Sequence, residues 1–394
     1  MSLSESLSEA WRKECLVRDD MEFLNAGTLG STLRSAFQST QDSMLKWLTE
    51  GPGGSLQNRS ARMYLNMMEE QDRCREAVAQ WMGVEKASIA LLGNATDCIN
   101  AALGSIPWQA GNRIITSDEE HEALQRPLAQ LAHRYGVIID MIPFPRTNEE
   151  VSDFLEKLRH TLVPSTKLVA VSHVSHVTGI RLPLAELAKA LESTPEVWLL
   201  ADGSHAAGTT VNFLNPRVDF YMFPGHKWLF GPIETGILWV SRRVLQETTP
   251  LLSGAPMMSA DGIRYERDDG AWRFEYGTRD WSKMVGLKEA VRFRQQWPEA
   301  VLIEHYQALG HAFIKGFVDE CSLIIVGAAP LYSVSVLDSD TVASVLWEEN
   351  RVLVKPQTGN IRISLPPWLD SQRSIELGRL VGRAVTRIQR QSLL

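Results

Sequence analysis

Short apolar runs alternate with helical patterns between about residues 70 and 245, and this alternation is what most limits the possible folds. The runs predict strands at 113–117, 136–144, 167–174, 197–202, 218–223 and 236–241. Apolar strands separated by helices are typical of a mostly parallel sheet that is covered by helices on both faces. We therefore expect an α/β fold in this part of the chain.

The pattern changes after about residue 250. Two long amphipathic helices are expected at about 282–296 and 299–318. They are followed by expected strands near 322–326, 331–337, 342–347 and 361–365, and by a last helix over about 371–390. This mixture predicts a smaller α+β domain at the C-terminus.

We accordingly divide the chain of 394 residues into three parts. Residues 1–60 are expected to form an N-terminal segment that packs on the small domain. Residues 61–250 are expected to form the large domain, and residues 251–394 the small domain. The stretch TEGPGGS at 49–55 predicts a flexible loop.

Charge and cysteine content argue against several classes of protein. The chain has 40 Lys and Arg against 47 Asp and Glu, and this net charge of −7 disfavours nonspecific binding to nucleic acid or to anionic membranes. We expect neither a transmembrane helix nor a secretory signal, because long apolar runs are missing. The four cysteines, Cys15, Cys74, Cys98 and Cys321, are far apart in the sequence. This spacing predicts a reduced, cytoplasmic protein without a disulfide framework.

Polar and titratable side chains follow the predicted strands. The segments concerned are NATD (94–97), DEEH (118–121), SHVSH (172–176), DGSH (202–205) and GHKW (225–228). In open α/β sheets, ligands bind at the carboxyl ends of the strands. We therefore expect these histidines, the aspartate and the lysine to meet in one functional site.

Lys227 and Asp202 are the two residues whose chemistry is most specific. A lysine in a partly apolar pocket has a lowered pKa, becomes nucleophilic and can form a Schiff base, although a lone lysine is more often a surface residue. Asp202 ends an apolar strand, where a carboxylate needs a cationic partner. A pyridinium nitrogen suits that role, as in pyridoxal-phosphate sites.

Two further positions suit an aromatic cofactor that carries a phosphate. Small residues and a hydroxyl at Gly93–Thr96 enter a predicted helix, and helix N-termini bind phosphate. The alternative is that Thr96 is an ordinary N-cap. His121 is either a surface residue or a ring that stacks on a planar cofactor.

A metal site is not expected. His173 and His176 are three residues apart, which on a strand places them on opposite faces, and no third ligand follows at a suitable spacing. We expect one of the two to be a core or supporting residue and the other to face the site. The motifs GxSxG, HExxH, GxGxxG and the P-loop are also missing.

These residues resemble the class V aminotransferase family of pyridoxal-phosphate enzymes, which have fold-type I. The resemblance is carried by FLNAGTLG (23–30), REAVAQWMGV (75–84), NATDCINAAL (94–103), DEEHEA (118–123), SHVSHVTG (172–179), DGSHAAG (202–208), FPGHKWLFGP (223–232), FEYGTRDW (274–281) and IRISL (361–365). It implies a mostly parallel sheet flanked by helices in the large domain, a smaller α+β C-terminal domain, and pyridoxal 5'-phosphate as the cofactor.

The resemblance also implies a role for each matching residue. Lys227, His121 and Asp202 would be catalytic, with Lys227 as the Schiff-base lysine. The cofactor would be bound by Ala95, Thr96, His121, His176, Asp202, His205, His226, Lys227 and Thr278. Thr278 would reach the phosphate of the partner subunit in a homodimer with a shared active site. Arg362 would bind the substrate carboxylate, with Asn25 and Gly27 in a loop over the substrate; the alternative for Arg362 is a surface salt bridge.

Some residues depart from the cysteine desulfurases of this family. His176 stands where they have asparagine, and Pro224 stands where they have serine or threonine. No cysteine lies between residues 341 and 362, where they carry the cysteine that forms a persulfide. A desulfurase with a persulfide relay is therefore disfavoured, and the sequence is closer to the branch of C–S lyases and isopenicillin N epimerases.

The expected activity is a C–S lyase, which eliminates a thiol from a cysteine-type amino acid and yields pyruvate and ammonia. The alternatives are an epimerase or an aminotransferase of the same family, or an inactive scaffold. No nucleic-acid or membrane partner is expected.

Overall fold

The computed structural model describes residues 3–49, 59–252, 254 and 269–392. In this part of the chain, a seven-stranded sheet has the order β2-β8-β7-β6-β5-β3-β4. Its strands are β2 (Ile89–Leu92), β3 (Arg113–Ser117), β4 (Ile138–Ile142), β5 (Thr166–Ser172), β6 (Trp198–Asp202), β7 (Phe220–Pro224) and β8 (Gly236–Val240). Only β8 runs antiparallel to its neighbours, so the predicted α/β fold with a mostly parallel sheet is confirmed.

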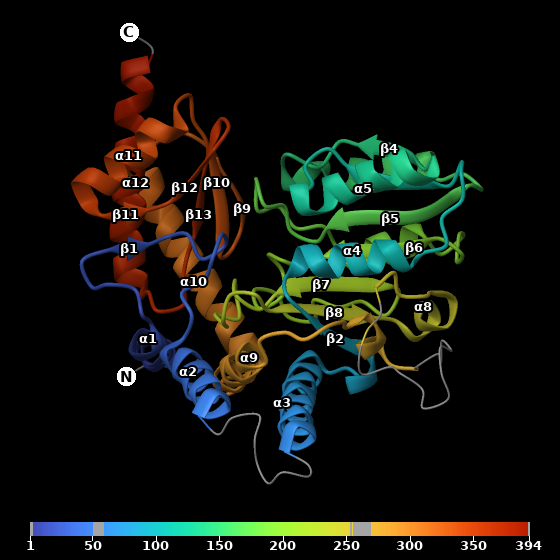
Figure 1. Ribbon diagram of the computed structural model, residues 1–394. Helices are drawn as coiled ribbons and strands as arrows, with labels where there is room; N and C mark the ends of the chain where they lie inside the picture. The colour runs from blue at the N-terminus through green and yellow to red at the C-terminus, as the bar shows by residue number, and fades with distance from the viewer. Residues whose placement is uncertain (1–2, 50–58, 253, 255–268, 393–394) are drawn as a thin grey trace, which may run out of the picture.

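Helices cover both faces of this sheet (Figure 1). They are α3 (Arg59–Met82), α4 (Ala95–Ser105), α5 (Glu122–Tyr135), α6 (Val151–Thr161), α7 (Leu184–Ala190) and α8 (Arg242–Glu247). Successive residues of β5 alternate between two apolar clusters: Leu168 packs with residues of α4 and α5, and Val169 with residues of α3 and α6. Both faces of the strand are buried, which explains why its sequence is apolar without interruption.

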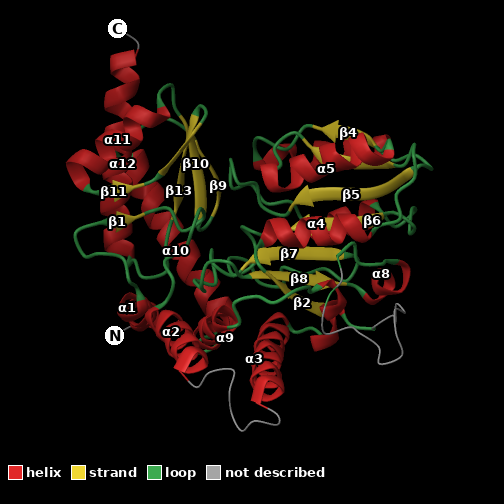
Figure 2. Cartoon of the chain, in the orientation of Figure 1, coloured by secondary structure: helices red, strands yellow, loops and turns green. Residues whose placement is uncertain are grey.

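A second, antiparallel sheet has the order β12-β13-β10-β9. Its strands are β9 (Ile325–Ala328), β10 (Leu331–Ser335), β12 (Lys355–Gln357) and β13 (Asn360–Ser364). The helices α9 (Ser282–Arg294), α10 (Glu299–Val318), α11 (Ser339–Asn350) and α12 (Ser371–Ser392) belong to the same C-terminal part. In Figure 2, the arrowheads of β5 and β7 point toward this second sheet.

The strand predicted at 342–347 is wrong, because these residues lie inside α11. The side chain of Asp338 caps the helix by accepting a hydrogen bond from the backbone N–H of Thr341. Val342 and Leu346, one helical turn apart, are both buried in the core. The cap and this spacing outweigh the strand preference of Thr341, Val342 and Val345.

The first residues of the chain pack against its last third. They form α1 (Leu3–Glu14), β1 (Glu22–Phe23) and α2 (Arg34–Thr49), and β1 pairs in parallel with β11 (Val352–Leu353). Leu7, Trp11 and Leu24 share one apolar cluster with residues of α10, α12 and β13. The loop predicted at 49–55 lies, apart from Thr49, outside the described residues.

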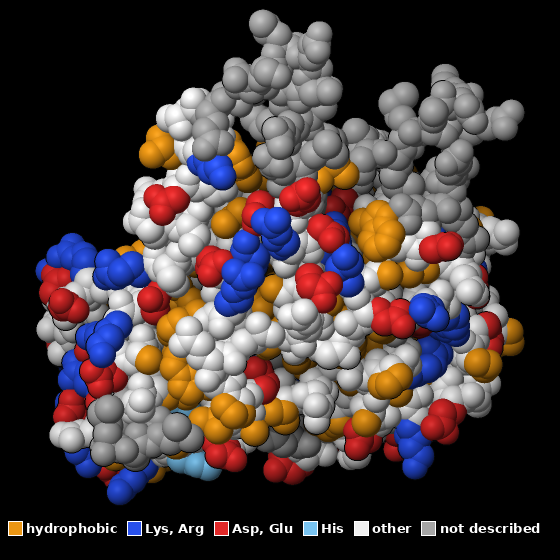
Figure 3. Space-filling view, turned by 90° about the horizontal axis from the view of Figure 1, so that it is seen from below, with side chains coloured by type: hydrophobic (Ala, Val, Ile, Leu, Met, Phe, Trp, Pro, Cys, Tyr) orange, Lys and Arg blue, Asp and Glu red, His pale blue; other side chains and the backbone are white. Residues whose placement is uncertain are grey.

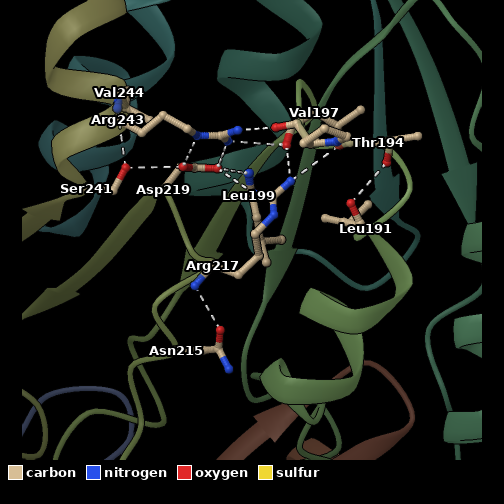
Figure 4. Close-up of polar contacts among 11 residues, drawn as sticks. Leu191, Thr194, Val197, Leu199, Asn215, Arg217, Asp219, Ser241, Arg243 and Val244 are labelled. Carbon is tan, nitrogen blue, oxygen red and sulfur yellow. Dashed lines mark hydrogen bonds and ion pairs between the residues drawn. The ribbon is translucent and has the colours of Figure 1, made fainter.

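A buried carboxylate joins three strands at the edge where β6 and β7 begin (Figure 4). Asp219 accepts hydrogen bonds from Arg217 at 3.0 Å, from Arg243 at 2.6 Å and from the backbone N–H of Leu199 at 2.9 Å. Its Oδ1 also accepts a bond from Ser241, just after β8. This network fixes the amino ends of β6 and β7, opposite the carboxyl ends where a ligand is expected.

The surface carries charges of both signs. Seen from below, Lys and Arg side chains are interspersed with Asp and Glu, and apolar side chains are exposed between them (Figure 3). None of the helices in the described residues is both long enough and apolar enough to cross a membrane.

Candidate active site

A cavity of about 370 Å³ lies at the carboxyl ends of β5, β6 and β7. The loop at 27–28 and the strands β12 and β13 complete its wall. Ten of the residues predicted for the site line it: Gly27, Ala95, Thr96, His121, His176, Asp202, His205, His226, Lys227 and Arg362. The strand-end pattern in the sequence therefore identified one real cavity.

Lys227 follows β7 and is partly buried in this cavity. Its Nζ lies 3.4 Å from Nε2 of His205. Burial lowers the pKa of Lys227 from about 10.5 to about 8; the charge of Asp202 opposes this change, and the charge of Arg362 adds to it. The amine is therefore easier to deprotonate than that of a surface lysine.

The loop between β1 and α2 also closely approaches the backbone at Lys227. Gly30 donates its N–H to the carbonyl oxygen of His226 at 2.8 Å. A Cβ at Gly30 would lie 2.2 Å from the carbonyl oxygen of Lys227, so only glycine fits at this crossing.

Asp202 ends β6 and is 6% exposed. Its Oδ1 accepts a hydrogen bond of 2.8 Å from the backbone N–H of Ser204, which orients the carboxylate in the cavity wall. Asp202 lies beside Ser172 in the parallel pairing of β5 and β6. No lysine or arginine pairs with this carboxylate among the described residues, so it can receive a cationic ligand.

The N-terminus of α4 forms one end of the cavity. Asn94 is the N-cap, because its side chain accepts a hydrogen bond of 2.8 Å from the backbone N–H of Asp97. The alternative that Thr96 is the N-cap is therefore wrong. The backbone N–H groups of Ala95 and Thr96, in the first turn, have no partner within the helix and suit an anion.

His226 lies in the same cavity, and its Nδ1 is buried without a hydrogen-bond partner among the described residues. Burial lowers the pKa of His226 to about 4, so the ring is neutral at neutral pH. Gly236 allows β8 to pass close to the start of α4: a Cβ there would lie 2.5 Å from the carbonyl oxygen of Asn94. Only glycine fits at this crossing of β8 and the start of α4.

Three more histidines surround the middle of the cavity. His121 is the N-cap of α5, where its Nδ1 accepts a hydrogen bond of 3.1 Å from Ala123. Its ring meets the ring of His176 edge to face, with centroids 5.0 Å apart. Burial lowers the pKa of His176 to about 3 and that of His205 well below its ordinary value. His121 is exposed, and partial loss of solvent lowers its pKa from the ordinary value. These rings are therefore uncharged at neutral pH.

His173 and His176 separate as expected. His173 is buried outside the cavity lining, with Nδ1 2.9 Å from the hydroxyl of Tyr221. His176 faces the cavity, and its Nδ1 is buried without a partner among the described residues. Within the described residues, no cluster of three His, Cys, Asp or Glu is placed to hold a metal ion.

Arg362, on β13, is 4% exposed. Its Nη1 donates to the carbonyl oxygen of His176 at 3.0 Å, and its Nη2 donates to the hydroxyl of Thr28. Burial lowers the pKa of Arg362 to about 10, and its Nε has no partner in the described structure. A buried guanidinium that is bound only to neutral groups can still bind a carboxylate by donating hydrogen bonds to it. The alternative that Arg362 forms a surface salt bridge is wrong, because the side chain is buried.

Two predicted residues do not line the cavity. Asn25 contacts the lining residue Thr28: the hydroxyl of Thr28 donates a hydrogen bond of 2.6 Å to Oδ1 of Asn25. Thr278 is exposed, on the loop after the turn Ala271–Phe274. Thr278 is therefore not part of the cavity wall of its own subunit.

The sequence reasoning missed several lining residues, among them Thr28, Ser172, Ser204, Lys355 and Gln357. Ser172 and Ser204 lie inside motifs that were singled out, so a closer reading of the strand ends would have found them. Lys355 and Gln357 lie on β12, a strand that was not predicted because Pro356 interrupts it.

The family model for aminotransferase class-V matches residues 35–330. A "Probable cysteine desulfurase" of Vibrio cholerae serotype O1 is 28% identical over 275 residues, which cover 68% of this chain and 67% of that protein. A "Cysteine desulfurase" of Escherichia coli O8 is 31% identical over 254 residues, 62% of this chain and 60% of that protein. The matches thus cover about three fifths to two thirds of these relatives.

Solved structures of low sequence identity share the fold over nearly the whole chain. The cystine C–S lyase C-DES in complex with cysteine persulfide has a TM-score of 0.81 at 24% identity, covering 91% of this chain and 97% of that one. The cysteine desulfurase CsdA from Escherichia coli has a TM-score of 0.81 at 21% identity, covering 96% and 98%. The family match over three quarters of its length shows that the chain belongs to the aminotransferase class-V family.

Proposed function

We propose that this protein is a pyridoxal-phosphate-dependent C–S lyase that acts on a cysteine-type amino acid. The observation that carries the proposal is the position of Lys227, whose amine has a pKa of about 8 in a cavity that also contains Asp202 and Arg362. The family match and the names of the relatives, cysteine desulfurase and cystine C–S lyase, support the same class of chemistry.

The cavity residues fit the cofactor. The first turn of α4, with Ala95 and Thr96, and the unpartnered Nδ1 of His226 would hold the phosphate. The Asp202 carboxylate would pair with the pyridine nitrogen, because it is buried without a cation of its own. The neutral rings of His121, His176 and His205 would surround the cofactor ring.

Each protein group has a task in the elimination. The cofactor, when bound, supplies an electron sink for the electron pair left at Cα of the substrate. The neutral Lys227 amine removes the Cα proton, for which its lowered pKa is suited. Arg362 holds the substrate carboxylate with a planar pair of donors, which fixes the Cα–H bond in one direction.

The positions of the cysteines indicate that the sulfur leaves with the product and is not transferred to a cysteine of the protein. None of the four lines the cavity, and all four are buried as free thiols. Cys321 lies in the apolar cluster shared by α10 and α12. A thiolate that accepts sulfur must reach the substrate, so the lyase that yields pyruvate and ammonia is favoured over a persulfide relay.

The test is release of pyruvate and ammonia by the purified protein from a series of S-substituted L-cysteines, with Lys227→Ala as the control. Equal amounts of both products, lost in the control, would establish the lyase. A cofactor spectrum that shifts with amino acids while no pyruvate forms would contradict it and support an epimerase or an aminotransferase. Colourless protein that takes up no added cofactor would contradict the whole proposal.

We also propose a homodimer in the cytoplasm, with domain boundaries near residues 60 and 250. Phe37, Met44, Leu45 and Leu48 expose apolar side chains along α2, and Leu48 is 74% exposed. An exposed apolar patch of this kind suits contact with a second copy of the chain. In such a dimer, Thr278 of one subunit would reach the cofactor bound by the other. Light scattering tests the dimer: a mass of twice 44.1 kDa supports it, and a monomer contradicts it.

A further inference from the structure

We propose that the substrate of this cavity carries a second anionic group at the end of its side chain, and that Lys355 binds that group. The inference rests on the proposed function, because it concerns the substrate of the same cavity. It extends that function from a cysteine-type amino acid to an S-substituted cysteine that ends in a carboxylate or a sulfonate.

The backbone pairing places Lys355 next to Arg362. In the antiparallel pair of β12 and β13, Lys355 lies directly opposite Arg362, and Gln357 lies opposite Asn360. Directly opposed residues project from the same face of a sheet, as do residues two apart on one strand. Lys355, Gln357 and Arg362 accordingly line the cavity together.

The charges around the cavity are unequal. Its lining contains three cations, Lys227, Lys355 and Arg362, but only one carboxylate, Asp202. The histidines of the lining do not alter this excess, because burial lowers the pKa of each of them. This excess of cations suits anionic ligands, and the phosphate of the cofactor would be one of them.

One substrate carboxylate accounts for only one of the two cations on this wall. Arg362 is fixed by the carbonyl oxygen of His176 and by Thr28, and it suits the α-carboxylate of an amino acid. The phosphate of the cofactor would lie at the start of α4, beside Ala95 and His226. Lys355 forms no ion pair with any residue that the structure describes, so its ammonium has no other anion.

Gln357, on the same wall, is bound to a neutral group. Its Nε2 donates to the carbonyl oxygen of His176 at 3.1 Å, the same oxygen that accepts from Arg362. The amide is thus fixed beside Arg362 and supplies no negative charge to Lys355. A substrate that spans both cations needs an anion at each end, which an S-substituted cysteine with an acidic substituent has.

The reaction balances with water as the only further reagent. The Cα proton passes to the Lys227 amine, the electron pair of the C–H bond becomes the second bond between Cα and Cβ, and the Cβ–S electron pair leaves with sulfur. The thiolate takes up a proton and departs as a thiol that carries the acidic group. Water hydrolyses the remaining aminoacrylate to pyruvate and ammonium.

The experiment compares two ligands that differ only in charge, S-carboxymethyl-L-cysteine and S-carbamoylmethyl-L-cysteine, with S-sulfo-L-cysteine as a third. Binding is measured by calorimetry and turnover by pyruvate release, for the native protein, Lys355→Met and Lys355→Arg. Lys189→Met, an exposed lysine on α7, is the matched control. We expect Lys355→Met to weaken binding of the carboxymethyl ligand about tenfold, and the carbamoylmethyl ligand less than about twofold.

Partial recovery in Lys355→Arg, and a preference for charged ligands that declines with salt, would add support. The ratio of the carboxymethyl to the sulfo ligand identifies which anion is preferred. Equal losses for the charged and amide ligands would overturn the proposal, because Lys355 would then act on the α-carboxylate or on the fold. Protein without cofactor, or without pyruvate from any ligand, would contradict the lyase instead, while calorimetry would still test Lys355.

Discussion

The charge of Lys227 depends on three neighbouring effects that act in different directions. Burial and the guanidinium of Arg362 disfavour the protonated amine, and the carboxylate of Asp202 favours it. With the pKa at about 8, a fraction of the amine is neutral at pH 7, and a larger fraction at pH 8. Asp202 therefore limits how far burial can lower the pKa.

This balance predicts the titration of Lys227 in cofactor-free protein. Acetylation of its amine, followed by mass spectrometry of the peptide, should rise with pH around a midpoint of about 8. Asp202→Asn should move the midpoint to lower pH, because a charge that favours the ammonium is removed. A midpoint near 10.5 in the native protein would contradict the prediction.

Glu120 is a second buried group that titrates near neutral pH. It accepts hydrogen bonds of 2.5 Å from Ser117 and from Ser172, a residue of the cavity wall. Burial raises the pKa of Glu120 from 4.5 to about 7, although both serines favour the charged form. The folded protein thus binds a proton here that the unfolded chain releases above about pH 4.5.

The free energy of unfolding should therefore fall as pH rises from about 4.5 to about 7. Glu120→Gln should remove up to about 3 kcal/mol of this decrease, since one pKa unit corresponds to about 1.4 kcal/mol. Urea titrations of both proteins at pH 5 and pH 8 would measure the difference. If the free energy of unfolding changes with pH equally in the native protein and in Glu120→Gln, then Glu120 does not cause the decrease.

Individual site residues could be predicted where the local sequence determines their position. Lys227 and Asp202 follow apolar strands, so the strand-end rule placed them without any knowledge of long-range contacts. Thr28 could not be found in this way, because its role arises from its contact with Arg362, 334 residues away in the sequence. Neither could Lys355, whose neighbour across the sheet is known only from the register.

At the scale of elements, long apolar strands were predictable and short ones were not. The strands β5, β6, β7 and β8 are buried on both faces almost throughout, so their composition alone distinguishes them, whereas the edge strand β4 is largely exposed. The strands β1, β11 and β12 have two or three residues each, and they exist because other segments pair with them. In α11, a cap that acts over three residues outweighed the strand preference of the residues that follow it.

The Asp219 network gives a prediction for the edge of the sheet opposite the cavity. Asp219→Ala removes the anion shared by Arg217 and Arg243 and leaves the N–H of Leu199 unpaired. The free energy of unfolding should fall by about 3 kcal/mol, as expected when one partner of a buried ion pair is removed. Chemical denaturation would measure this loss.

Asp219→Asn is the matched control, because it keeps an acceptor for Leu199 and should cost less. Ligand affinity of the folded Asp219→Ala protein should stay unchanged, since the network lies at the amino ends of β6 and β7. Unchanged stability together with weaker ligand binding would contradict this assignment.

At the scale of the whole molecule, Trp11 joins the first helix to the rest of the protein. It is completely buried, and its ring contacts Phe230 at 5.3 Å and Phe293 at 5.0 Å between centroids. Phe230 donates its N–H to the carbonyl oxygen of Lys227 at 3.2 Å. The packing of α1 is thus two contacts away from Lys227.

Trp11→Ala should lower the free energy of unfolding by about 3–5 kcal/mol, the usual cost of removing a large buried aromatic side chain. It should also weaken cofactor retention, because Phe230 loses its support. Trp11→Phe keeps most of the packing and should cost clearly less. Denaturation curves and the cofactor content after dialysis would measure both effects; retention equal to that of the native protein would disprove the link to Lys227.

The contact between Thr28 and Arg362 has a consequence for how the protein is made. Thr28 is synthesised early, whereas Arg362 is added to the chain 334 residues later. The part of the cavity wall that contains both residues therefore cannot assemble until Arg362 has been synthesised. Until α10 and α12 have been synthesised, Leu7 and Trp11 of α1 also lack the apolar surface that covers them, and exposed surface of this kind favours aggregation.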